Sequence, residues 1–94
     1  MKMTREEEVV RGGEAKRVLE NPMYQEAVEN VREGIYSLMQ RSAMGDEKTH
    51  NRLVIALQLV SQIEGHLKMV MQTGKMAEMQ TSDGIVARMR RMVA

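Results

Sequence analysis

The sequence contains no cysteine, tryptophan or phenylalanine, and it has only one proline and two tyrosines. Without cysteine there can be no disulfide framework and no thiolate metal site. The two histidines, His50 and His66, are sixteen residues apart and lack the spacing of a helical metal-binding pair. We therefore predict no metal, no other cofactor and a cytoplasmic location.

The chain also lacks an excess of charge of either sign. Fourteen basic and thirteen acidic residues give a net charge of +1, which provides no overall field for gripping nucleic acid. With two tyrosines as the only aromatic residues, a platform for stacking unpaired bases is missing too. Nucleic acid is therefore not the partner that the composition favours.

No long apolar run is present. The longest stretch without a charged residue, 53–63, is far shorter than the roughly 20 residues that span a bilayer. Charged residues follow Met1 and Lys2, where a signal peptide would need an apolar segment. We expect neither secretion nor a membrane partner.

Motifs of catalysis are missing as well. The chain shows no nucleophile spaced from a base, no carboxylate pair and no metal constellation. Gly12-Gly13 is not followed by the lysine and hydroxyl residue of a phosphate loop. We predict that the protein is not an enzyme.

What the sequence does contain is helical patterning, with the clearest start signal at Asn21-Pro22. Gly45 can end the helix that begins there, and Asp46 can cap the next one. Because the connection is so short, the spacing predicts an all-α antiparallel helical hairpin over about 22–44 and 47–73. Its inward positions alternate by four and three residues, as in coiled coils: Tyr24, Val28, Val31, Ile35 and Leu38 on the first helix, and Leu53, Ala56, Val60, Ile63, Leu67 and Val70 on the second.

The flanking segments are shorter. Thr4 and Glu7 have capping-box spacing, and Gly12-Gly13 is expected to interrupt the helix that starts there. We predict a loosely held charged arm over 1–13, a hairpin domain over 14–79 and, over 80–94, a linker with a basic amphipathic helix. Gly74 is expected to end the long helix. Gly34 stands opposite Ala56, which indicates either a close approach of two helices or coincidence.

The second helix of the predicted hairpin carries more apolar residues than one partner helix can cover. A second copy of the hairpin would cover them in one symmetric step, although the segment around Val18-Leu19 could fold back over part of them. We therefore expect a homo-oligomeric bundle. The candidate interface residues are Val54, Leu57, Leu59 and Met71.

Three arginines near the end of the chain, Arg88, Arg90 and Arg91, form a local positive cluster. They could contact phosphates or an acidic protein partner. The simpler interpretation, which we favour, is a solvated helix end whose positive charges complement the helix dipole.

Three short motifs resemble small helical proteins that tailed bacteriophages encode among their head and DNA-packaging genes. They lie between residues 15 and 77: Ala15-Lys16-Arg17-Val18-Leu19-Glu20-Asn21-Pro22, Ile63-Glu64-Gly65-His66-Leu67 and Thr73-Gly74-Lys75-Met76-Ala77. The resemblance implies a phage-encoded scaffold or adaptor in virion assembly or DNA packaging. It implies other phage structural or packaging proteins as partners, in the host cytoplasm or in the virion.

Two other functions stay open at this point. A nucleic-acid-associated regulator would use the C-terminal arginines, and its binding would weaken steeply with salt. A small inhibitor would instead occlude a host protein.

Overall fold

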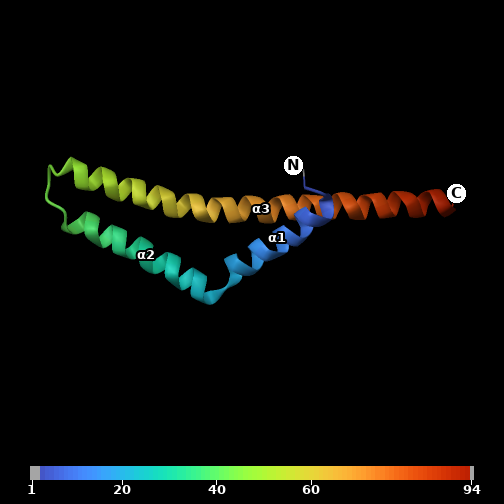
Figure 1. Ribbon diagram of the computed structural model, residues 1–94, viewed down its shortest axis with the longest axis horizontal. Helices are drawn as coiled ribbons and strands as arrows, with labels where there is room; N and C mark the ends of the chain where they lie inside the picture. Colours follow the sequence, from blue (N-terminus) through green and yellow to red (C-terminus); the bar gives the residue numbers. More distant parts are fainter. Residues whose placement is uncertain (1–2, 94) are drawn as a thin grey trace. The chain divides into compact units, whose positions relative to one another are not determined.

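The computed structural model describes residues 3–93, with the side chains of 81–88 and 91–93 left out of that description. It contains three helices, α1 (Arg5–Glu20), α2 (Pro22–Arg41) and α3 (Glu47–Val93) (Figure 1). No strand occurs among residues 3–93. The predicted all-α class is confirmed.

The helix starts lie at the predicted residues, and side chains cap each of them. Thr4 Oγ1 accepts a hydrogen bond from the Glu7 amide at 3.1 Å, one residue before α1 begins. Asn21 Oδ1 accepts from the amides of Met23 and Tyr24 at 2.9 and 3.1 Å, with Pro22 in the first turn of α2. Each cap satisfies amides that have no partner within the helix.

The predicted helix ends are wrong at two places. α1 continues through Gly12-Gly13, and α3 continues through Gly74 and the expected 80–84 loop to Val93. The short C-terminal helix is therefore part of α3. Gly12 and Gly74 lie where α1 and α3 pack together. A glycine inside a helix is only about 1 kcal/mol less favourable than alanine, so neither residue has to end its helix. α2 ends at Arg41, earlier than the predicted 44, and Gly45 takes its positive φ of 89° within the turn that follows.

Contacts divide the chain into two compact units. The terminal unit joins residues 3–18 to residues 67–93. Its centre is a close contact between α1 and α3, where an added Cβ atom on Gly12 would lie 2.8 Å from the Gly74 Cα atom. Ala15 and Ala77 are both buried there. Small residues on both helices therefore let the two backbones touch.

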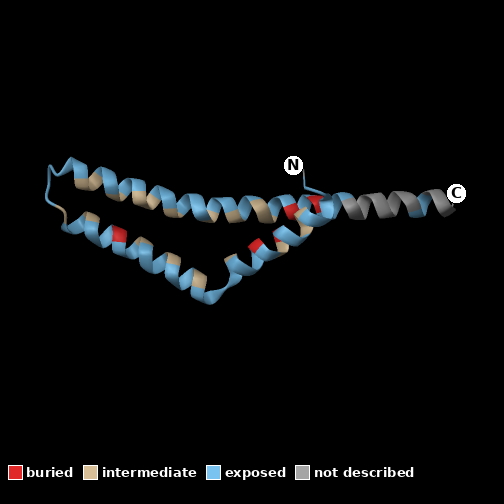
Figure 2. Ribbon diagram, viewed as in Figure 1, coloured by how far each residue is buried: buried red, intermediate tan, exposed pale blue. Residues whose placement is uncertain are grey.

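The middle unit, residues 19–66, consists of the end of α1, α2 and the first part of α3. Its interhelical contacts progress outward from the turn, from Ser42 with His50 to Arg32 with Glu64. Ile35 is its one buried side chain among the described residues (Figure 2). Tyr24, Val28, Leu53, Ala56 and Val60 are half-buried, as the predicted seam requires.

Three seam positions differ from the prediction. Val31, Leu38 and Ile63 are exposed, whereas the next residue along the chain, Arg32, Met39 or Glu64, is half-buried in each case. One step along a helix turns a side chain by about 100°, so the contact face has rotated toward these neighbours. The Arg32–Glu64 ion pair explains why Arg32 is half-buried in place of Val31, and Glu64 in place of Ile63. Of the two interpretations of Gly34 opposite Ala56, close approach is not seen, since an added Cβ atom on Gly34 meets nothing within 4 Å.

Candidate interaction surface

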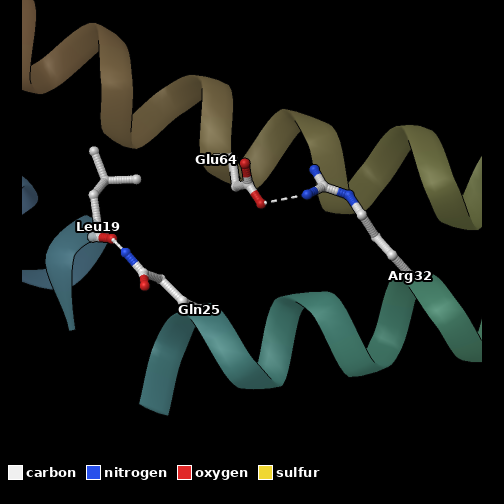
Figure 3. Close-up of polar contacts among 4 residues, drawn as sticks. All are labelled: Leu19, Gln25, Arg32 and Glu64. Carbon is white, nitrogen blue, oxygen red and sulfur yellow. Dashed lines mark hydrogen bonds and ion pairs between the residues drawn. The ribbon is translucent and has the colours of Figure 1, made fainter. Parts of the chain in front are cut away.

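One edge of the middle unit is polar. The guanidinium Nη1 of Arg32 on α2 lies 2.8 Å from Glu64 Oε1 on α3 (Figure 3). Their side chains are 32% and 19% exposed, so solvent screens this attraction only partly. At the start of α2, Gln25 Nε2 donates to the carbonyl oxygen of Leu19 at 2.9 Å. Arg32, Glu64 and Gln25 therefore have polar partners within the chain.

The turn between α2 and α3 is held by side chains. The Ser42 hydroxyl donates to the carbonyl of Met39 at 2.8 Å, which leaves its oxygen to accept from His50 Nε2, also at 2.8 Å. Asp46 caps α3 by accepting from the Thr49 hydroxyl at 2.7 Å and from the Thr49 amide at 3.2 Å. These hydrogen bonds from Thr49 hold the pKa of Asp46 below its ordinary value of 3.8. Both histidine and carboxylate thus have structural roles here.

The hydroxyl of Tyr24 is buried and has no hydrogen-bond partner among the described residues. The ring of Tyr24 is half-buried. A hydroxyl that loses water without gaining a partner opposes folding. Tyr24 therefore contributes through its ring and not through its oxygen.

The other edge of the middle unit is apolar. Near the turn, Leu38 and Leu53 line a shallow hollow together with the polar residues Arg41, Ser42, Asp46 and Thr49. Val31 and Ile63 each lie one residue before a member of the Arg32–Glu64 pair, about 100° around the helix from it, so both belong to the opposite edge. Leu38 follows Val31 by seven residues and shares its side of α2. Leu59 and Ile55 continue the stripe from Ile63 at steps of four. We call this set, Val31, Leu38, Ile55, Leu59 and Ile63, the apolar edge.

The apolar edge has no cover. Its five side chains are between 49 and 59% exposed. Isolated surface leucines are common, but several large aliphatic side chains gathered on one edge mark a surface that binds another molecule. This edge is the strongest candidate surface among the described residues.

The predicted interface residues divide between exposed and half-buried positions. Val54 and Leu59 are 43% and 55% exposed, while Leu57 and Met71 are half-buried. Val54 lies about 140° around α3 from Leu59, so these two residues do not share one face. Sequence periodicity alone does not separate the two edges, and Val31, Leu38, Ile55 and Ile63 were not among the candidates.

Of the three arginines, Arg90 is exposed, and the side chains of Arg88 and Arg91 lie outside the described residues. His50 bonds to Ser42, and His66 is exposed. Within the described part of the chain, no group of three or more histidine and acidic side chains could hold a metal ion.

By length and composition, one segment of the described chain is long and apolar enough to cross a membrane, Glu47–Gln80 of α3, whose most apolar 18-residue window has a mean hydropathy of 1.2. Helices that pack in the cores of soluble proteins pass the same test. In this chain the segment includes Glu64, which is paired with Arg32 of α2. The ion pair therefore links this segment to α2.

Comparison of the chain with protein-family models, with curated proteins and with solved structures found no match.

Proposed function

We propose that this chain is a non-catalytic helical interaction protein that works as a homo-oligomer. Its middle unit would act as an antiparallel helical hairpin that supplies the association surface. The observation that carries the proposal is the small core. Among the described residues only Ala15, Ile35 and Ala77 are buried apolar residues. No large side chain among them is fully buried.

Such a core is too small to stabilise one copy alone. Burying a side chain such as Ile35 contributes about 1.5–3 kcal/mol, whereas fixing the backbone of each residue costs about 1–2 kcal/mol. Small domains usually make up this deficit by association, by disulfides or by metals. Since the sequence contains no cysteine, we favour association.

The biological setting that we propose is assembly or DNA packaging in a tailed bacteriophage, as a scaffold or adaptor in the host cytoplasm or the virion. Its support is the resemblance of the three motifs within residues 15–77. A helical module without a reactive centre suits that role. The genes on either side of the coding sequence provide a direct check, because head and packaging genes would favour assembly, and a different neighbourhood would count against it.

Light scattering after size exclusion tests the association. We expect a mass that is a multiple of 10.7 kDa at micromolar concentration. The melting temperature should rise with protein concentration, because association stabilises the folded state by mass action. A 10.7 kDa species with a concentration-independent melting temperature would contradict the proposal. Steep weakening of duplex DNA binding by salt would instead favour a regulator of nucleic acid.

A further inference from the structure

We propose that the apolar edge binds a second copy of this chain, with the two α3 helices antiparallel and the two-fold axis passing beside Leu59. This inference rests on the proposed function, because it names the surface and the geometry of the self-association. The starting observation is that Val31, Leu38, Ile55, Leu59 and Ile63 are uncovered on one edge of the middle unit.

The order of residues along α3 is symmetric about Leu59. Isoleucine stands four residues before it and four residues after it, at Ile55 and Ile63. An antiparallel two-fold axis at Leu59 therefore places Ile55 of one copy against Ile63 of the other, and Leu59 against Leu59. An isologous interface requires such self-complementarity of one patch.

α2 supplies a matching pattern at the same level. Ala27, Val31, Gly34 and Leu38 follow steps of four, three and four, and all four are exposed. The large side chains are Val31 and Leu38, and the small residues beside them leave room for side chains of a second copy. An added Cβ atom on Gly34 would meet nothing within 4 Å. This second seam on α2 suits a four-helix arrangement.

Charge favours the antiparallel arrangement over a parallel one. Arg52 lies seven residues before Leu59, and His66 lies seven residues after it. Antiparallel packing brings Arg52 of one copy toward His66 of the other, whereas parallel packing would set the two Arg52 side chains against each other. Like charges in apposition disfavour an association.

The available area is sufficient for a stable dimer. Five half-exposed aliphatic side chains make a patch on the order of a few hundred Å² per copy. Arg52, His66 and the small residues of α2 surround this patch. They extend the contact area toward the roughly 800 Å² per partner of a standard interface. The apolar edge carries no charged residue at its centre, as the middle of an interface requires.

Disulfide formation in single-cysteine variants tests this geometry directly, because the parent chain has no cysteine. The variants are Leu59→Cys, Ile55→Cys, Ile63→Cys and the control Ser61→Cys, equilibrated in a glutathione redox buffer. Leu59 and Ser61 are both exposed, so neither change empties the core. Circular dichroism and light scattering establish that each variant keeps the helicity and the mass of the parent.

We expect Leu59→Cys to form a disulfide dimer with itself. Ile55→Cys and Ile63→Cys should each remain reduced alone, because a residue four positions from the axis lies about 12 Å from its own mate at 1.5 Å per residue. A disulfide needs Cα atoms within about 7 Å. An equimolar mixture of these two variants should give a mixed dimer.

The control reports on the other edge. Ser61 is only two residues from Leu59 but lies about 160° away around α3, on the edge that carries Val54. If Ser61→Cys cross-links in place of Leu59→Cys, the interface is on that edge and this inference is wrong. Cross-linking of every single variant with itself would show a parallel arrangement. An oligomer in which Leu59→Cys does not cross-link would mean that another surface mediates association, and a monomeric mass would overturn the proposed function itself.

Discussion

Gly12 of α1 and Gly74 of α3 meet backbone to backbone: an added Cβ atom would lie 2.8 Å from Gly74 Cα if placed on Gly12, and 2.7 Å from Gly12 Cα if placed on Gly74. A Cβ atom on Gly74 would also come within 2.9 Å of the carbonyl oxygen of Glu8. Backbone atoms cannot move aside as the end of a flexible side chain can. This contact therefore fixes how α1 packs on α3 within the terminal unit.

Gly12→Ala and Gly74→Ala should accordingly destabilise the protein. Overpacking of this kind costs about 1–3 kcal/mol, which is reduced by the roughly 1 kcal/mol that alanine gains over glycine in a helix. Urea unfolding followed by circular dichroism measures the change. Gly13→Ala is the matched control, since its Cβ atom meets nothing within 4 Å, and it should stabilise the chain. Equal behaviour of all three variants would contradict the close contact.

The ion pair of Arg32 and Glu64 should show coupling in a double-mutant cycle. Both side chains are less than one-third exposed and their charged atoms are 2.8 Å apart. Screening limits the coupling to about 1 kcal/mol. We expect Arg32→Ala and Glu64→Ala to be individually destabilising and the double variant to lose less than the sum. Strict additivity would mean that the pair contributes nothing to stability.

Removing the hydroxyl of Tyr24 should not destabilise the fold. Its oxygen is buried and lacks a partner among the described residues, and such a group opposes folding by about 1–3 kcal/mol. Tyr24→Phe keeps the ring and should leave the urea midpoint unchanged or raise it. Tyr24→Leu is the comparison that alters the ring, and it should lower the midpoint. A clear loss of stability in the phenylalanine variant would indicate that the hydroxyl has a partner in the assembled protein.

Asp46 should make the stability of the chain depend on pH. Hydrogen bonds from Thr49 lower its pKa in the folded state below the ordinary 3.8. A lowered folded-state pKa means that the stabilisation is present above about 3.8 and is lost as the pH falls through the lower, folded-state pKa. Urea midpoints of the parent and of Asp46→Asn should therefore differ at neutral pH and converge in acid. A difference that stays constant with pH would mean that the carboxylate charge is not involved.

The beginnings of the helices could be predicted from the sequence because the residues that cap each helix lie next to its first turn. The amides at the start of α2 need acceptors within a few residues, and Asn21 next to Pro22 supplies them whatever else packs nearby. The same applies to Thr4 before α1 and Asp46 before α3. Eight of the eleven predicted seam residues are buried or half-buried, among them Tyr24, Val28 and Ile35, which recur with the period that a helix requires.

The ends of the helices, by contrast, are not determined by residues nearby in the chain. Glycine is permissive, so Gly12 and Gly74 fit either a helix break or a close helix contact, and only their mutual approach decides between these. The choice of edge was likewise undecided in the sequence. Val31 and Arg32 are neighbours in α2, and the partner Glu64 on α3 determines that Arg32 turns inward and Val31 stays exposed.

The sequence by itself therefore determined the all-α class, the capped helix starts and an apolar surplus on α3, because each depends on composition, on near neighbours or on periodicity. Only the tertiary structure decided which glycines pack, which residues turn inward and which edge remains apolar. Those outcomes depend on residues far apart in the chain, such as Gly12 with Gly74 and Arg32 with Glu64. The helical period predicts the buried face of a helix to within about one residue. Contacts with residues far away in the chain then determine which residue is buried.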